Sequence, residues 1–170
     1  MIRLARPEDA AAIALVHVRS WQQAYRELMP ADYLASLDDS LDRREAWWRE
    51  AIGQGTQTVF VALSGEQVAG WISVGVSRDE DVDQAATGEV SAIYVLADHW
   101  GSGVGRALWL QGEKQLAGQG FTALTLWVLV DNHRATDFYR KAGLQPQAAS
   151  IRSLAPGGQT LEEIRYRKTL

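Results

Sequence analysis

The chain contains no cysteine and only three histidines among its 170 residues. Without cysteine it forms no disulfide, offers no thiolate ligand to a metal and carries no cysteine nucleophile. The histidines, His17, His99 and His133, have none of the close spacings that are typical of zinc sites. We therefore expect a protein that works without a metal ion.

Long apolar runs and an excess of basic residues are also absent. No apolar run reaches the roughly 18 residues that a membrane-spanning helix needs. The segment Met1–Leu4 leads directly into polar sequence, so no signal peptide is predicted. The net charge is −4, whereas nucleic-acid-binding domains usually present a basic face. These absences predict a cytoplasmic protein that binds neither membranes nor nucleic acid.

What is present is the composition of an ordinary globular protein. A length of 170 residues and an apolar fraction of 46% predict one domain over residues 1–170 with a full hydrophobic core. No internal repeat, linker or low-complexity tract divides the chain. The residue patterns predict the order strand, helices, two strands, strand, helix, strand, helix, two strands. This order indicates one α/β (α+β) domain with a mixed sheet.

The N-terminal region is predicted to be helical after a short first strand, Ile2–Ala5. An apolar stripe at helical spacing predicts a long helix that begins near Pro7 and that Pro30 stops. The members of the stripe are Ile13, Val16, His17, Ser20, Trp21, Ala24, Tyr25 and Leu28. The place of His17 in this stripe favours a hydrogen-bonded, partly buried histidine over a catalytic one.

Two further helices are expected before the second strand. One covers Ala31–Leu37, and the other runs from Ser40 to about Ile52 and is ended by Gly53 and Gly55. The helices predicted between the first two strands are longer than a simple connection requires. We expect it to form the wall of a pocket.

The rest of the chain alternates strand and helix patterns. The predicted strands are Thr56–Leu63, Val68–Val76, Glu89–Val95, Leu124–Val130, Gln145–Leu154 and Leu161–Lys168. The turn Ser64–Glu66 joins the first two as a hairpin. Leu124–Val130 is almost continuously apolar, as in a sheet covered on both faces. Helices are predicted over Val104–Gly118 and from a cap at Asn132 to a stop at Gly143.

One loop, Arg78–Gly88, is rich in acidic residues. These are Asp79, Glu80, Asp81 and Asp83. A solvated hairpin loop explains this composition, because charge runs are usually exposed. The alternative is an acidic rim that attracts a cationic substrate such as a polyamine.

The segment Gly88–Gly105 combines a strand with a glycine-rich loop that opens a helix. Unpaired N–H groups and the positive end of the helix dipole make such a loop an anion site. The loop is not a Walker motif, and its G-x-G-x-G spacing does not match the dinucleotide fingerprint. By itself the spacing predicts a phosphate ligand, or glycines that serve only tight strand–helix packing.

A second motif narrows these alternatives. Asn132–Leu144 matches N-x-x-A-x-x-F-Y-x-x-x-G followed by Phe or Leu, and with it the sequence resembles the GNAT superfamily of acyl-coenzyme A-dependent N-acetyltransferases. The pyrophosphate loop of that family commonly starts with Gln or Arg, where this chain has Trp100. The resemblance covers about Val59–Leu170 well, and also the opening Ile2–Ala10.

The resemblance implies a fold and a cosubstrate, acetyl-CoA. The fold is a mixed, mostly antiparallel sheet of about seven strands, flanked by helices and splayed between Glu89–Val95 and Leu124–Val130. The backbone near Tyr94, Val95 and Leu96 would pair with the pantetheine arm, and Asn132 would contact the arm while capping its helix. The pyrophosphate would be held by the amides of Gly101, Ser102, Gly103, Val104, Gly105 and Arg106.

The resemblance also implies an acid and a base. Glu89 matches the glutamate that is the general base in several GNAT enzymes, although a solvated residue at a strand end is the alternative. Tyr139 matches the usual acid, which would contact the coenzyme sulfur; the alternative is a core aromatic with a satisfied hydroxyl. The absence of cysteine agrees with direct transfer in a ternary complex.

The acceptor is expected to be a small-molecule or peptide amine. Trp21, Tyr25 and Tyr33 lie in the helices that wall the acceptor site in this fold, although core packing also explains each of them. An acyl-CoA sensor without turnover, or another nucleotide binder, remains an alternative function. Strand edges near the C-terminus make a homodimer plausible.

Overall fold

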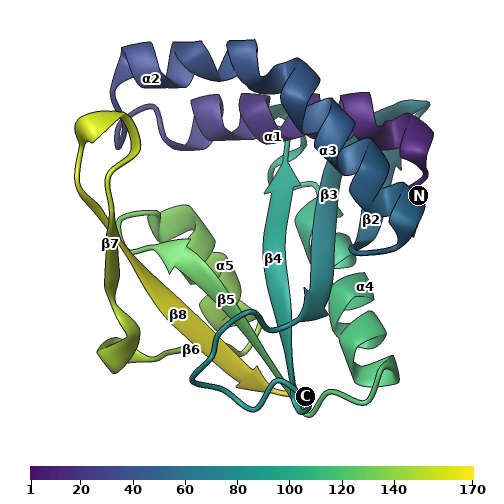
Figure 1. Cartoon of the computed structure of the whole chain (residues 1–170), viewed down its shortest axis with the longest axis vertical. Helices are drawn as coiled ribbons and strands as arrows, with labels where there is room; N and C mark the ends of the chain where they lie inside the picture. The colour runs from purple at the N-terminus through teal and green to yellow at the C-terminus, as the bar shows by residue number, and fades with distance from the viewer.

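A computed structural model describes all 170 residues of the chain. Its centre is an eight-stranded sheet in the order β1-β2-β3-β4-β5-β8-β6, and β7 also pairs with β8 (Figure 1). The strands are β1 (Ile2–Leu4), β2 (Thr58–Ser64), β3 (Gln67–Val76), β4 (Thr87–Val95), β5 (Ala123–Leu129), β6 (Gln145–Pro146), β7 (Arg152–Leu154) and β8 (Leu161–Thr169). Every pairing is antiparallel except β4 with β5. The expected mixed, mostly antiparallel sheet is confirmed.

Five α-helices flank this sheet. They are α1 (Ala10–Ala24), α2 (Ala31–Ser36), α3 (Leu41–Gln54), α4 (Val104–Gly118) and α5 (His133–Lys141). Figure 1 shows α1, α2 and α3 running together across one end of the strands, with α4 and α5 elsewhere on the sheet. None of these helices is both long enough and apolar enough to cross a membrane.

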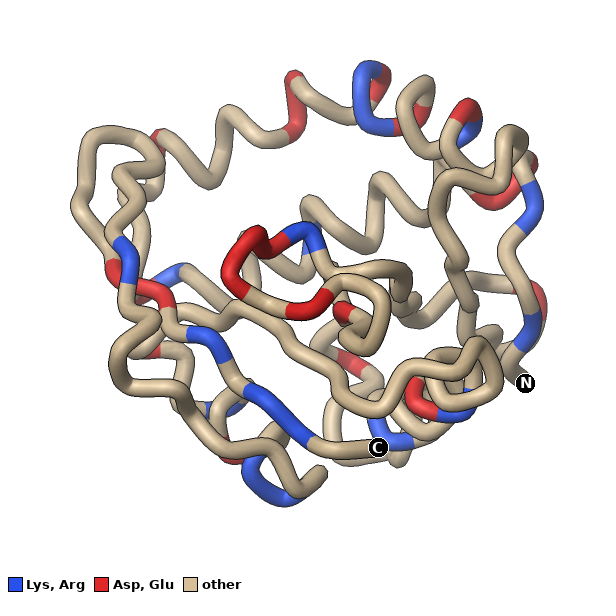
Figure 2. Tube along the Cα trace, turned by 60° about the horizontal axis from the view of Figure 1, so that its bottom comes forward, with Lys and Arg blue, Asp and Glu red and all other residues tan.

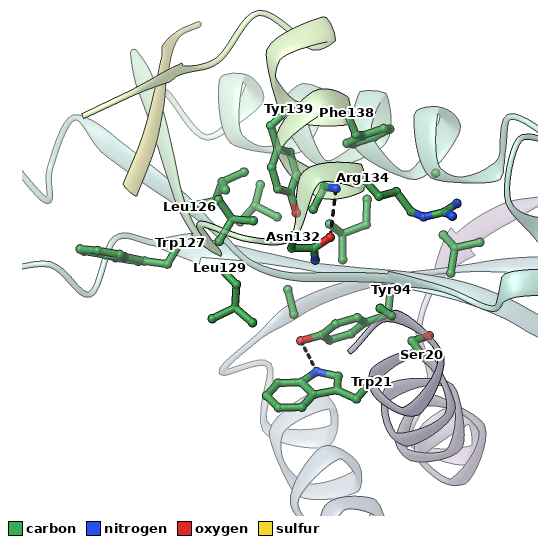
Figure 3. Close-up of a pocket in the computed structure, with 18 of the residues that line it drawn as sticks. Ser20, Trp21, Tyr94, Leu126, Trp127, Leu129, Asn132, Arg134, Phe138 and Tyr139 are labelled. Carbon is green, nitrogen blue, oxygen red and sulfur yellow. Dashed lines mark hydrogen bonds between the residues drawn. The ribbon is translucent and has the colours of Figure 1, made fainter. Parts of the chain in front are cut away.

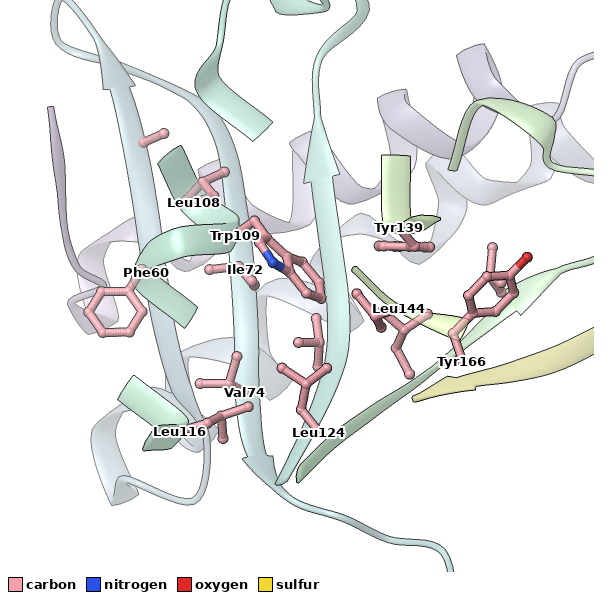
Figure 4. Packing of buried hydrophobic residues seen from close by; sticks show 14 residues of the cluster. Phe60, Ile72, Val74, Leu108, Trp109, Leu116, Leu124, Tyr139, Leu144 and Tyr166 are labelled. Atoms are coloured by element: carbon pink, nitrogen blue, oxygen red, sulfur yellow. The ribbon is translucent and has the colours of Figure 1, made fainter. Parts of the chain in front are cut away.

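Side-chain alternation along β2 and β3 divides the core between the two faces of the sheet. Val59, Val61 and Trp71 pack with α1 and α3. Their sequence neighbours Phe60 and Ile72 point to the opposite face, in the cluster that includes Leu108 and Leu116 of α4 and Tyr139 of α5 (Figure 4). This is the two-residue period of a strand, and it explains why β2 and β3 are apolar on both faces.

The sheet splays between β4 and β5. These strands pair only where Thr87–Glu89 faces Ala123–Thr125, and the later residues of both strands have no ladder partner across the gap. Figure 1 shows the two strands diverging from this short contact. The predicted splay is therefore present, and it opens a space beside the carboxyl ends of two parallel strands, where α/β sheets bind ligands.

Two predicted helix boundaries are wrong. The first helix ends at Ala24 rather than near Leu28, and Pro30 starts α2 instead of stopping α1. Residues 25–29 form a turn in which Met29 N–H donates to the carbonyl of Tyr25, and Met29 is buried. The apolar stripe continues because the turn packs on the same core as the helix. Gly53 lies inside α3, and only Gly55, with φ of 67°, ends it.

The predicted strand Gln145–Leu154 is also wrong as a single element. It divides into β6, a 3₁₀ turn over Ala148–Ser150, and β7, and both strands pair with β8. The ladder continues past Pro146, since Gln147 N–H donates to the carbonyl of Arg165 at 2.8 Å, and it is the 3₁₀ turn that then interrupts the strand. This division raises the strand count from the expected seven to eight. The hairpin at Ser64–Glu66 and the bounds of Val104–Gly118 are as predicted.

Candidate active site

A cavity of about 550 Å³ occupies the splay. Its walls come from α1, β4, the loop before α4, β5, α5, β7 and β8, segments that are far apart in the sequence. Figure 3 shows Tyr139 and Asn132 on one side of the strands and Trp21 and Tyr94 on the other. One continuous space thus connects the glycine-rich loop with the aromatic residues of α1.

The glycine-rich loop presents free backbone donors at one end of this cavity. Gly101 and Gly103 have φ of 74° and 88°, a conformation that residues with a side chain rarely adopt. The amides of Gly103–Arg106 donate no hydrogen bond within the protein, and the first backbone bond of the helix comes from Ala107 to the carbonyl of Gly103. Ser102 differs, because its N–H is directed at the carbonyl of His99 at 3.4 Å.

Trp100 links this loop to β4 and to a positive charge. Its indole N–H donates to the carbonyl of Val95 at 2.8 Å. The guanidinium carbon of Arg134 lies 3.6 Å from the centroid of the Trp100 ring, a cation–π geometry. The tryptophan that replaces the usual Gln or Arg therefore fixes the loop and positions an arginine beside the free amides.

Fewer backbone N–H groups of β4 than predicted are free to bind a ligand in the gap between β4 and β5. Leu96 N–H donates to the carbonyl of Ala69 beside β3, so it is not available. Because N–H directions alternate along a strand, Tyr94 also faces β3, and Val95 faces the gap. Of the three residues expected to pair with pantetheine, only Val95 has a suitably directed N–H.

Asn132 caps α5 at the edge of the cavity, as predicted. Its side-chain oxygen accepts a hydrogen bond from Ala135 N–H at 3.2 Å. The residue also lines the cavity, so capping leaves its amide nitrogen available. Contact with the pantetheine arm stays a prediction.

Glu89 is buried and paired, so the alternative interpretation of it as a solvated strand-end residue is wrong. Only 3% of the residue is exposed. Its carboxylate accepts hydrogen bonds from the Arg78 backbone N–H at 3.0 Å, from Arg78 Nε at 3.1 Å and from Nη2 at 2.8 Å. Because Arg78 itself is largely exposed, this pair joins a buried carboxylate to the mouth of the cavity.

Tyr139 lies against the cavity with a hydroxyl that makes no hydrogen bond to the protein. Its ring packs on Trp109 and Phe138 at centroid distances of 5.7 and 5.6 Å. Burial raises the pKa of the phenol above its usual value. A core aromatic with a satisfied hydroxyl is therefore not what the structure shows, since the ring packs but the hydroxyl is free.

Two of the three aromatic residues expected at the acceptor wall line the cavity. Trp21 donates from Nε1 to the hydroxyl of Tyr94 at 2.8 Å, and Tyr25 packs edge-on against Trp21 with centroids 5.0 Å apart. Tyr33 does not reach the cavity, which corrects that prediction. It packs instead against Gly157 in the turn before β8, because α2 turns this face toward the turn.

The acidic loop is mostly exposed, as predicted for a solvated hairpin loop, but two of its acids are not free. Acidic positions follow one another along the connection between β3 and β4 (Figure 2). However, Asp79 and Asp81 both pair with the buried guanidinium of Arg165, at 3.1 and 2.6 Å. Asp79 also accepts from Trp127 Nε1 at 3.1 Å. Two of the four acids thus share one positive charge, and they tie the loop to β5 and β8.

The sequence analysis missed four residues at this mouth of the cavity: Arg78, Trp127, Arg152 and Glu163. Trp127, Arg152 and Glu163 lie in β5, β7 and β8, and Arg78 follows the end of β3. They form no motif along the chain that a sequence pattern could detect. The only sequence signal was Arg152 and Glu163 as charged residues in predicted strands. No three His, Cys, Asp or Glu side chains gather as a possible metal site.

Comparison with known proteins agrees with this architecture. The sequence profile of the acetyltransferase (GNAT) family matches residues 20–144. The uncharacterized N-acetyltransferase YuaI of Bacillus subtilis is 38% identical over 132 residues, which cover 77% of this chain and 72% of that protein. Two solved structures share the fold.

The first is the PaiA N-acetyltransferase of Thermoplasma acidophilum in complex with coenzyme A, with TM-score 0.76, 17% identity, and coverage of 100% of this chain and 98% of that one. The second is YncA of Salmonella typhimurium with acetyl-CoA, with TM-score 0.73, 21% identity, and coverage of 100% and 93%. The cavity, the two motifs and these similarities together show that the chain belongs to the acetyltransferase (GNAT) family.

Proposed function

We propose that the protein transfers an acetyl group from acetyl-CoA to a primary amine in a ternary complex. The observation that carries this proposal is the placement of two features in one cavity. Free amides of Gly103–Arg106 lie at one end, and the buried carboxylate of Glu89 lies at the other. An anionic, elongated cosubstrate fits such a space, because the amides and Arg134 bind phosphate while the splay accommodates a narrow arm.

The residues have distinct tasks in this proposal. Bound acetyl-CoA supplies an activated acetyl thioester. Val95 N–H faces the gap, where it can donate to the carbonyl oxygen on which negative charge develops, an effect worth about 3 kcal/mol per donor. Asn132 orients the arm from the opposite strand end.

Proton transfers complete the reaction. The amine nitrogen forms a bond to the acetyl carbon, the carbon–sulfur bond breaks, and the sulfur leaves as a thiolate. Glu89 accepts the proton that the ammonium must lose before it attacks, directly or through water. The acetylated nitrogen must lose one further proton to become a neutral amide. Tyr139 supplies a proton to the thiolate and regains the one that this nitrogen loses, and its raised pKa keeps the hydroxyl protonated at neutral pH before transfer.

The test is release of free thiol from acetyl-CoA across a panel of amines, with the acetylated product identified by mass. We expect amine-dependent thiol release at a rate well above that of thioester hydrolysis without amine. Tight binding of coenzyme A without transfer to any amine would contradict the proposal.

One observation favours a second function, an acyl-CoA-binding module without turnover. All the hydrogen bonds to Glu89 come from Arg78, so the proposed base is occupied by a cation. A stable complex with another protein that depends on bound coenzyme, together with no acetyl transfer, would support this alternative.

A further inference from the structure

Two arginines stand at the acceptor end of the cavity with unused donors. Arg78 binds Glu89 through Nε and Nη2, and its Nη1 makes no hydrogen bond. Arg152 binds Glu163 through Nε alone, which leaves both terminal nitrogens free. Both residues line the cavity. Each guanidinium is thus held in place by a carboxylate while part of its fork faces the open space.

The two arginines belong to one cluster. Glu163 pairs with Arg152 and is also near enough to Arg78 to contribute to the raised pKa of that guanidinium. The guanidinium carbon of Arg152 lies 3.6 Å from the centroid of Trp127, which fixes its plane. Fixed, forked donors bind carboxylates with two parallel hydrogen bonds, and a preorganised fork loses little conformational freedom on binding.

The charges of Arg78 and Arg152 are balanced by Glu89 and Glu163. The nearby Asp79 and Asp81 share one guanidinium, that of Arg165, so one negative charge is left over there. A cationic acceptor such as a polyamine would still meet two arginines at the mouth, whose own acids are already paired. A zwitterion fits better, because its ammonium group can approach Glu89 while its carboxylate binds the free guanidinium donors.

Part of the lining of the same cavity is apolar. It is formed by Trp21, Ala24, Tyr25, Met29 and Leu154. Such a surface binds an apolar group of the acceptor by removing it from water. The two arginines, the Glu89 carboxylate and an apolar surface therefore line the part of the cavity where the amine must attack.

Resting on the proposed function, we propose that the acceptor is a free amino acid with an apolar side chain. Its carboxylate binds Arg78 and Arg152, its side chain packs on the wall formed by Trp21, Tyr25 and Met29, and its α-amino group receives the acetyl group. The products are the N-acetyl amino acid and the free thiol of coenzyme A.

The experiment compares kcat/KM for matched acceptors: leucine, leucinamide and 3-methylbutylamine; phenylalanine, phenylalaninamide and 2-phenylethylamine; and spermidine. We expect each amino acid to exceed its amide by about 10-fold or more, the effect of hydrogen bonds to a charged group. The comparison with the amide is the more stringent one. A carboxamide makes the neighbouring amino group less basic, so more of it is unprotonated at neutral pH and free to attack. Without a carboxylate subsite, the amide would therefore react faster than the amino acid.

The outcomes separate this inference from the proposed function. Transfer to amides, simple amines or spermidine as fast as to the amino acids overturns the inference and leaves acetyl transfer to amines intact. A preference for a peptide N-terminus over the free amino acid overturns it as well. Transfer to no acceptor, with coenzyme A bound, overturns both.

A variant tests the subsite itself. Arg152→Gln should lower the ratio of kcat/KM for leucine to that for leucinamide by about 10- to 100-fold. Arg49→Gln, which removes a similarly half-exposed arginine paired with Glu45 on α3, is the control and should leave the ratio unchanged. Coenzyme A binding measured for each variant reports that the fold is intact. An unchanged ratio in Arg152→Gln would overturn the carboxylate subsite.

Discussion

The Glu89 carboxylate is 3% exposed and is bound on both oxygens by Arg78, whose side chain is 70% exposed. A buried carboxylate without a partner would be costly, so this arginine is what allows a charged group to lie at the base of the cavity. If Glu89 accepts a proton during the reaction, Arg78 must release part of its contact or a water must relay the proton.

Glu89→Gln should lower kcat for acetyl transfer by about 100-fold or more, the usual contribution of a general base. The affinity for coenzyme A should hardly change, because the free amides lie at the other end of the cavity. Steady-state kinetics and calorimetric titration measure the two effects. Glu162→Gln, at an exposed position of β8, is the matched control. Full activity in Glu89→Gln would exclude the proposed role.

Tyr139→Phe should lower kcat by about 10- to 100-fold while leaving thermal stability nearly unchanged. The hydroxyl makes no hydrogen bond to the protein, and phenylalanine retains the packing on Trp109 and Phe138. Thermal unfolding and kcat are measured on the same preparation. A large loss of stability with normal kcat would show that Tyr139 is only a core residue.

Gly103→Ala should weaken coenzyme A binding by about 10-fold and cost about 1 kcal/mol of stability, because φ of 88° disfavours a side chain. Relief of that strain would move the free amides that follow it. Gly118→Ala, at the other end of α4, has room for a methyl group and should stabilise the helix slightly. Equal coenzyme affinity in both variants would contradict the anion site.

The free energy of unfolding should fall as the pH drops from about 6.5 toward 3. Burial and the charge of Arg44 lower the pKa of His17 to about 3, whereas the unfolded chain binds that proton near 6.5. Between these values the unfolded state holds more protons, so acid destabilises the fold by up to about 1.4 kcal/mol per pH unit. His17→Phe should flatten this slope in denaturant titrations. The same slope in the variant would place its origin elsewhere.

Arg165→Gln should reduce the free energy of unfolding by about 3 kcal/mol, because it leaves the mostly buried Asp79 without its ion pair. Adding Asp79→Asn should recover much of this loss, since the uncompensated charge is then removed. Arg167→Gln, at an exposed position two residues further along β8, is the control. Equal effects of the two arginine variants would contradict a structural role for the pair.

Much of the fold follows from local patterns. The bounds of Val104–Gly118 are as predicted, and the β2–β3 hairpin forms at Ser64–Glu66, because periodicity, glycine stops and turn residues act over a few positions. The errors arose where tertiary packing competes with the pattern. Tyr25 leaves the helix while its stripe continues, and a 3₁₀ turn over Ala148–Ser150 divides a strand that composition alone makes continuous.

The site shows the same division. The sequence by itself determined the glycine-rich loop at the start of α4 and the cap at Asn132, because each is a short motif whose geometry is local. It offered Glu89 and Tyr139 as candidates only through the resemblance to a family. Only the tertiary structure decided that Arg78 pairs with the Glu89 carboxylate, that Arg165 binds Asp79 and Asp81 of the acidic loop, and that Arg152 reaches the cavity. These charges meet between residues that are 11 to 86 positions apart in the chain, and an ion pair depends on distance and burial rather than on order along the chain.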